Sequence, residues 1–302
     1  MTDTQEKILK LKKARGALIL AHYYQSLEIQ DVADLVGDSF ALAQKAAKAH
    51  EQTLIVCGVR FMAESAKILS PEKTVYLPAE NAGCPMADMI RASDVLELRA
   101  KYPGAAVVCY VNSSAAVKAV SDICCTSSSA EAVVRSRPEK QIIFVPDRNL
   151  GAYVAKSFPE KEFILFDGCC PIHDAVRKSD LDSAREKFPD AAALVHPECR
   201  AQVCENADFV GSTAGILAQA KTSAAPALII GTENTIVSRL MRDLPGKKIV
   251  PIRDGFVCVN MRKTLPEDVL DCLEGRRAPL TLPPELLSAA AKSLEAMVAV
   301  GN

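Results

Sequence analysis

The segment Asp167-Gly168-Cys169-Cys170-Pro171-Ile172-His173 follows a strand-like run, residues 162–166, and its Gly and Pro hold a thiol at the end of that strand. Cys84 lies 86 residues before Cys170, and Cys258 lies 88 residues after it. Both of these cysteines also stand in loop-like segments. Three thiols spaced nearly one domain length apart predict three copies of one unit, each of which offers a thiol to a shared point.

A true repeat must recur elsewhere in the chain, and the apolar runs at residues 18–24, 107–112 and 193–198 do so. Each run ends in two polar residues at positions i and i+2, with separations of 88 and 86 residues between copies. The pairs are His22 with Tyr24, Tyr110 with Asn112, and His196 with Glu198. A hydroxyl stands 17 residues after the first member of each pair: Ser39, Ser127 and Thr213. A later apolar run also recurs, at residues 53–59, 141–145 and 227–231. Four features in one order with one period, the cysteines included, indicate three internal repeats.

Strand-like runs of four to seven residues alternate with helical segments, which is typical of parallel βαβ units. In the first copy we expect helices at residues 5–15, 27–36, 40–50 and 62–69, and strands at 17–21, 54–59 and 74–77. The fold class that follows is α/β, with three pseudo-equivalent three-layer αβα domains around a pseudo-threefold axis. We expect these domains at residues 1–84, 85–170 and 171–258, with residues 259–302 packing back on the first.

The composition is that of an ordinary soluble globular protein, with 302 residues, 49% hydrophobic and 24% charged. A net charge of −1 favours neither a nucleic-acid nor a membrane partner, and no apolar run approaches the roughly 20 residues of a spanning helix. Residues 1–13 lack the apolar region of a signal peptide, so we expect a cytoplasmic protein. Its 11 cysteines are then expected to be reduced thiols or metal ligands.

The three repeated hydroxyls, Ser39, Ser127 and Thr213, each stand at the expected start of a helix. A helix N-terminus exposes unpaired N–H groups and carries about half a positive charge, which suits a carboxylate or phosphate. An alternative is that these residues are ordinary N-caps. Three at matched positions, each with its strand-end polar pair, favour a shared cavity that binds a small polyanion.

The thiols of Cys84, Cys170 and Cys258 are candidate ligands for zinc or an iron–sulfur cluster. A four-iron cluster with three protein ligands keeps one iron open, and an open iron binds a substrate oxygen as a Lewis acid. The absence of a C-x-x-C pair argues against an ordinary zinc ribbon. Spacing alone leaves Cys169 open as an alternative to Cys170.

The chain resembles the quinolinate synthase family over essentially its whole length. The resemblance is carried by a set of motifs: Ala21-His22-Tyr23-Tyr24-Gln25, Gly37-Asp38-Ser39, Cys84-Pro85-Met86-Ala87-Asp88-Met89, Tyr110-Val111-Asn112, Cys125-Thr126-Ser127, Cys170-Pro171-Ile172-His173, His196-Pro197-Glu198-Cys199, Gly211-Ser212-Thr213 and Cys258-Val259-Asn260-Met261. The family motif places the second cluster ligand three residues before His173, which favours Cys170. Some members carry a C-x-x-C-x-x-C run at the last ligand; Cys258 stands alone here, so the redox disulfide proposed for those members does not carry over.

The resemblance implies three αβα domains around one active site and a [4Fe–4S] cluster held by one cysteine per domain. It also implies a transferase of NAD biosynthesis that condenses iminoaspartate with dihydroxyacetone phosphate to give quinolinate, phosphate and water. L-aspartate oxidase or aspartate dehydrogenase would then hand over the first substrate. His173 is expected behind the cluster ligands.

Catalytic candidates are the titratable strand-end residues, with Glu198 as general base, Tyr24 as proton relay, and His22 and His196 positioning substrate oxygens. The catalytic set is His22, Tyr24, Tyr110, His196 and Glu198. The expected substrate-binding set is His22, Ser39, Tyr110, Asn112, Ser127, His196, Glu198, Ser212 and Thr213.

Two other functions also fit parts of the pattern. A binding or sensory protein would use a structural metal and an anion cradle, but it would not need Tyr24, Tyr110 and Glu198 to face the anion. An iron–sulfur hydro-lyase of the aconitase type also uses an open iron, but its ligands usually include a close C-x-x-C pair. Anaerobic protein that is brown and bleaches in air would separate an iron–sulfur enzyme from a colourless zinc protein.

Overall fold

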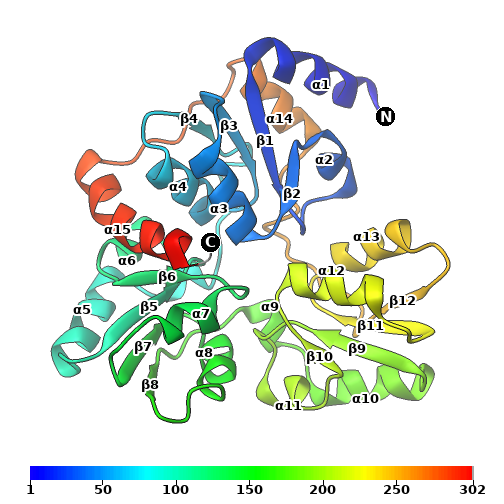
Figure 1. Cartoon of the computed structure of the whole chain (residues 1–302). Coiled ribbons are helices and arrows are strands. Elements are labelled where there is room, and N and C mark those ends of the chain that lie inside the picture. Colours follow the sequence, from blue (N-terminus) through cyan, green and yellow to red (C-terminus); the bar gives the residue numbers. More distant parts are fainter. Residues whose placement is uncertain (301–302) are drawn as a thin grey trace.

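The structure is a computed structural model that describes residues 1–300. It is an α/β protein with three four-stranded, wholly parallel sheets, which confirms the predicted fold class, and Figure 1 shows the three units set around a common centre. The strand orders are β2-β1-β3-β4, β6-β5-β7-β8 and β10-β9-β11-β12, so the same order recurs in each unit. The domain boundaries expected at residues 84, 170 and 258 stay a prediction.

The first sheet shows why each unit has three layers. Strand β1, which lies between β2 and β3, is buried at every position, and its alternate side chains point to opposite faces of the sheet. Leu18 and Leu20 pack with α3 and α4, whereas Ile19 packs with α1, α2 and α14. The elements are α1 (Asp3–Arg15), β1 (Ala17–His22), α2 (Leu27–Val32), β2 (Leu35–Gly37), α3 (Ser39–Lys48), β3 (Thr53–Cys57), α4 (Arg60–Leu69) and β4 (Thr74–Tyr76).

The second and third units repeat this alternation. The second contains η1 (Ala87–Met89), α5 (Ala92–Lys101), β5 (Ala106–Tyr110), α6 (Ala115–Ala119), β6 (Ile123–Cys125), α7 (Ala130–Arg135), β7 (Gln141–Val145), α8 (Arg148–Ala155) and β8 (Glu162–Leu165). The third contains α9 (Pro171–Asp174), α10 (Lys178–Lys187), β9 (Ala191–Val195), α11 (Ala201–Cys204), β10 (Phe209–Val210), α12 (Thr213–Thr222), β11 (Ala227–Gly231), α13 (Thr235–Asp243) and β12 (Lys248–Pro251).

The C-terminal segment joins two units. Helix α14 (Pro266–Leu273) packs on α1 and buries Val269 and Leu273 against the first sheet. Helix α15 (Pro284–Val300) lies against α4 of the first unit but also against α6 and β6 of the second, as Figure 1 shows. Ser293 of α15 donates its hydroxyl hydrogen to the carbonyl of Lys118 at 2.9 Å. The tail therefore packs on the second unit as well as on the first.

The expected helix over residues 27–36 is wrong at its C-terminal end. Helix α2 stops at Val32, and residues 35–37 form β2 beside β1. Asp34 sets this turn, because its N–H donates to the carbonyl of Ile19 and its Oδ2 accepts the N–H of Ile19 at 2.8 Å. The same arrangement recurs at Asp122 and Asp208, and each aspartate is also paired with a base on the preceding long helix: Lys12, Arg99 and Arg185.

A second structural repeat involves buried or half-buried ammonium groups. Lys73, Lys161 and Lys247 precede the last strand of each sheet and are spaced by 88 and 86 residues. Each donates to two carbonyls at or just after the end of α3, α7 or α12. A cation at that end of a helix is favourable because the carbonyls there lack intrahelical partners. The threefold repeat therefore extends from the predicted site residues to the scaffold that holds them.

Candidate active site

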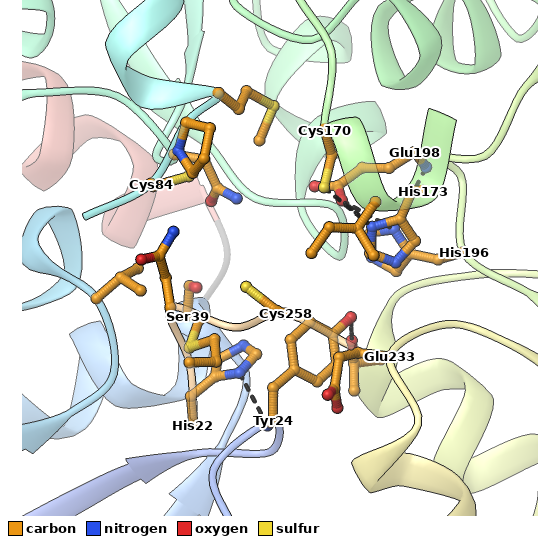
Figure 2. A pocket seen from close by; sticks show the side chains of 18 of the residues that line it. His22, Tyr24, Ser39, Cys84, Cys170, His173, His196, Glu198, Glu233 and Cys258 are labelled. Carbon is orange, nitrogen blue, oxygen red and sulfur yellow. Dashed lines mark hydrogen bonds and ion pairs between the residues drawn. The ribbon is translucent and has the colours of Figure 1, made fainter. Parts of the chain in front are cut away.

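The three units enclose a cavity of about 250 Å³ at the carboxyl ends of their strands. Figure 2 shows thiols, imidazoles and carboxylates from different units around this space. Every site residue expected from the sequence lines it except Ser212, which instead caps α12 by accepting the N–H of Gly215. The lining set is His22, Tyr24, Ser39, Cys84, Tyr110, Asn112, Ser127, Cys170, His196, Glu198, Thr213 and Cys258.

Two buried histidines, His22 and His196, have the same backbone contact. The N–H of Tyr24 donates to His22 Nδ1 at 3.1 Å, and the N–H of Glu198 donates to His196 Nδ1 at 3.3 Å. A ring nitrogen that accepts an N–H cannot carry a proton, so both rings carry their hydrogen on Nε2. Burial lowers the pKa of His22 to about 4 and that of His196 to about 3, although Glu198 opposes the shift. At neutral pH both rings are therefore uncharged Nε2–H donors.

Glu198 is almost completely buried, with 3% of its surface exposed. The Tyr110 hydroxyl donates to its Oε1 at 2.7 Å, and His173 Nδ1 lies 2.8 Å from its Oε2. Burial alone would raise the pKa of Glu198, but His173 beside it and the hydrogen bonds from His173 and Tyr110 hold the pKa below its usual range. Glu198 is thus an ionised carboxylate that is ready to accept a proton.

A continuous hydrogen-bonded chain joins Glu198 to Tyr24. His173 Nε2 lies 3.0 Å from the hydroxyl of Thr232, which lies 2.7 Å from the hydroxyl of Tyr24. The Tyr24 hydroxyl also contacts Thr213 at 2.9 Å. His173 Nδ1 faces a carboxylate and therefore carries a hydrogen, and the Thr232 hydroxyl bridges His173 Nε2 and the Tyr24 hydroxyl. Burial raises the pKa of Tyr24 well above its usual value, with the charge of Glu198 adding to the effect, so its proton stays in place.

The three hydroxyls expected at helix starts occupy different positions. Ser39 and Thr213 are the first residues of α3 and α12, and the N-caps are the residues before them, Asp38 and Ser212. Ser127 lies before α7 in a turn closed by the N–H of Thr126 and the hydroxyl of Ser129, so it does not begin a helix. The Ser127 hydroxyl is 3.2 Å from His196 Nε2. The plain N-cap interpretation thus fails for all three.

The thiols of Cys84, Cys170 and Cys258 reach the cavity from three loops, one per unit (Figure 2). Burial raises the pKa of Cys84 to about 12 and also raises the pKa values of Cys170 and Cys258. Backbone N–H groups oppose this at each sulfur; they belong to Ala87 and Met86, to His173, and to Met261 and Asn260. N–H donors aimed at sulfur favour the thiolate and are a feature of iron–sulfur sites. This donor set therefore fits a cluster with three cysteine ligands.

The two adjacent cysteines, Cys169 and Cys170, have different surroundings. Cys170 lines the cavity, and its sulfur lies 3.2 Å from His173 Nδ1. Cys169 is outside the lining, and Arg148 and Asp174 are its charged neighbours. This placement favours Cys170 as the ligand, as the family motif implies.

One group of side chains within residues 1–300 brings three possible ligand atoms within 4.8 Å of one another: Cys170, His173 and Glu198. Two atoms bound to one tetrahedral zinc at about 2.1 Å lie about 3.4 Å apart. The 2.8 Å between His173 Nδ1 and Glu198 Oε2 is shorter and is the distance of a hydrogen bond. As it stands, the group is a hydrogen-bonded triad that shares Cys170 with the three-cysteine set.

Thr232 and Glu233 were not expected in the site from the sequence, and His173 was expected only behind the cluster ligands. Thr232 and Glu233 are fully buried and directly follow β11, and Glu233 lines the cavity. Asp147 holds the matching position after β7, 86 residues earlier, and is also fully buried. Polar residues directly after a buried parallel strand are the signal that would have found them.

The comparisons with known proteins agree with this geometry. The sequence model of the family described as Quinolinate synthetase A protein matches residues 6–299. A "Quinolinate synthase" from Methanoregula boonei is 49% identical over 99% of this chain and 100% of its own length. One from Caldicellulosiruptor bescii is 48% identical over 98% of each chain, and "Quinolinate synthase 2" from Methanosarcina acetivorans is 46% identical over 98% and 96%. With a match over nearly its whole length and one cavity shared by three repeated units, the chain belongs to the quinolinate synthase family of enzymes.

Proposed function

We propose that this enzyme is a transferase that condenses iminoaspartate with dihydroxyacetone phosphate and releases quinolinate, phosphate and two waters. The observation that carries the proposal is that the thiols of Cys84, Cys170 and Cys258 line one cavity together with the neutral imidazoles of His22 and His196 and the ionised carboxylate of Glu198. The expected suppliers of the first substrate, L-aspartate oxidase or aspartate dehydrogenase, and a cytoplasmic setting belong to the same proposal. None of the helices in residues 1–300 is long and apolar enough to cross a membrane.

Cys84, Cys170 and Cys258 would hold a [4Fe–4S] cluster. When bound through three cysteines, such a cluster supplies an open iron that acts as a Lewis acid. The protein supplies the rest of the site. It contributes thiolate-favouring N–H groups and the polar groups that line the cavity with the three sulfurs.

Both substrates are anions, and the cavity offers neutral donors to hold them. The Nε2–H group of His22 can donate to a carboxylate or phosphate oxygen, and His196 Nε2–H donates to the Ser127 hydroxyl, whose own hydrogen can then go to a second substrate oxygen. The N-termini of α3 and α12, with the hydroxyls of Ser39 and Thr213, add a favourable dipole at two further places. Asn112 also lines the cavity, and its buried Oδ1 has no partner in the protein. That oxygen suits a substrate amine or hydroxyl.

Proton transfers would be divided between Glu198 and Tyr24. Glu198 Oε1 or Oε2 accepts a proton from the substrate as a general base. The Tyr24 hydroxyl donates a proton to a leaving oxygen, and Thr232 and His173 connect this hydroxyl to Glu198 by hydrogen bonds. This division follows from charge, because Glu198 is ionised and the raised pKa of Tyr24 keeps its hydroxyl protonated.

The proposal is tested by quantifying iron, sulfide and zinc in anaerobically purified protein beside a quinolinate assay with both substrates. Brown protein with about four irons and four sulfides per chain, which bleaches in air and forms quinolinate, is the expected result. Colourless protein that holds one zinc would favour the Cys170–His173–Glu198 group as the metal site and contradict the cluster.

A further inference from the structure

The three cysteine loops share one anchor to the sheet. The N–H of Arg60 donates to the carbonyl of Ala82, that of Arg148 to Gly168, and that of Asn234 to Phe256, each at 2.8 Å. Each carbonyl lies two residues before a cysteine: Cys84, Cys170 and Cys258. Each donor follows the third strand of its unit, at or next to the start of a helix. The repeat therefore fixes the approach to every thiol in the same way.

The residue just before each of these N–H donors differs among the three units. This residue decides whether the cysteine loop has a second attachment besides the main-chain hydrogen bond. In the first unit it is Val59, which has no polar side chain. In the second it is Asp147, whose Oδ2 accepts the N–H of Cys170 at 3.0 Å. In the third it is Glu233, whose Oε1 accepts from Nε and Nη2 of Arg262 at 3.2 and 3.1 Å. Arg262 lies four residues after Cys258.

The loop that carries Cys258 is thus held at both ends by neighbouring residues of one turn. Asn234 binds the chain at Phe256, before the cysteine, and Glu233 binds Arg262, after it. Between these two points Val259 is 68% exposed, whereas Met261 is buried and its carbonyl accepts from the Gln25 side chain at 2.6 Å. Glu233 is fully buried, and its Oε2 accepts the N–H of Thr235 at 2.7 Å, so this carboxylate is fixed before Arg262 binds it. Figure 2 shows Glu233 beside the labelled Cys258 and Tyr24.

We propose that Glu233 and Arg262 are positioning residues that clamp the Cys258 loop, so that its thiol stays in the place of a metal ligand. The inference rests on the proposed cluster function. Two N–H bonds to one buried carboxylate oxygen give the loop a direction as well as an attachment. Without Arg262, Glu233 keeps the amide N–H of Thr235, and the part of the loop after Cys258 loses its bond to Glu233 and is held by the Gln25 side chain, which donates to the carbonyl of Met261 at 2.6 Å.

The first test measures hydrogen exchange in the whole apo protein, which needs no cluster. Arg262→Met should speed exchange of the amides from Val257 to Met261 by about tenfold or more, the loss expected for a hydrogen bond to a charged group. Exchange in β1, β5 and β9 should not change. Arg262→Lys keeps the positive charge but lacks the paired N–H groups of the guanidinium, so its amide exchange rate should be intermediate. A matched control is Arg137→Met, which breaks a similar two-bond pair with Glu139 far from the cavity.

The second test follows the rate at which a chelator removes iron from anaerobic protein. We expect at least about tenfold faster loss from Arg262→Met, a smaller effect for Glu233→Gln, which keeps one acceptor, and no change for Arg137→Met. If the wild-type protein holds iron, and Arg262→Met has the same rates of amide exchange and of iron loss as wild type, the clamp is overturned. Faster loop exchange without faster iron loss would also overturn it. Wild-type protein that binds no iron would instead contradict the proposed function.

Discussion

Replacing Thr232 by Val tests the hydrogen-bonded chain between Glu198 and Tyr24 with little change in side-chain shape. The hydroxyl makes two buried contacts, at 2.7 Å to Tyr24 and at 3.0 Å to His173 Nε2. Each such bond contributes about 1 kcal/mol net, so losing both costs about 2 kcal/mol, or about 30-fold in rate. If protons travel through this hydroxyl, the rate should fall further, by about a hundredfold or more, which is the usual contribution of general acid–base catalysis.

The assay is anaerobic quinolinate formation, with kcat and KM determined separately and iron content measured on the same samples. Thr232→Val should lower kcat about 30-fold or more while KM and iron content stay near wild type, because Thr232 is not among the residues that line the cavity. Thr232→Ser retains the hydroxyl and is the matched control, expected within about threefold of wild type. Wild-type kcat in the Val variant, or equal loss in Val and Ser, would refute the relay.

Further predictions concern the base, the ligands, the anion site and the imidazoles. Glu198→Gln should keep its iron and bind substrate but accumulate an open-chain or incompletely dehydrated intermediate, visible by mass spectrometry of quenched mixtures; quinolinate at the wild-type rate would move the base elsewhere. Cys170→Ser should lose iron and activity while Cys169→Ser keeps both, and the reverse pattern would exchange the two assignments. Thr213→Ala should weaken substrate binding about tenfold or more with an unchanged cluster spectrum, whereas a change in melting temperature alone would make it structural. Since the pKa of His22 is about 4 when folded and about 6.5 when unfolded, apo-protein stability should fall as pH drops below about 6.5, and less so in His22→Asn.

The fold could be predicted because each unit repeats its pattern of burial. Apolar runs such as residues 18–21 are buried on both faces, and the cysteine and strand-end spacings of 86 and 88 residues gave the number of units. Strand β2 was missed because three residues are too few to show a period, and Asp34, which fixes it, acts through backbone groups of Ile19. The placement of α15 across two units depends on contacts with α6, far away in sequence.

The cavity could be predicted only in part. Strand-end residues such as His22 and Glu198 were identified because parallel strands bring their carboxyl ends to one edge. Thr232 was not, because its role depends on Tyr24, 208 residues away, and on His173 between them. Arg262 was not, because an arginine in a loop is ordinarily a solvated surface residue, and only the buried Glu233 beside it makes it distinctive.

The divergence of the three repeats explains how one scaffold carries acid–base chemistry. If the strand-end position of Glu198 held a carboxylate in all three units, three like charges would meet in one cavity, and each would raise the pKa of the others. The chain instead places Tyr24, Asn112 and Glu198 at these positions, so only one of the three matched positions holds a carboxylate. Tyr110 from the second unit and His173 then donate to it, which keeps it ionised in a site with little solvent. The repeated framework sets where the groups meet, and the differences between copies set which of them is the base.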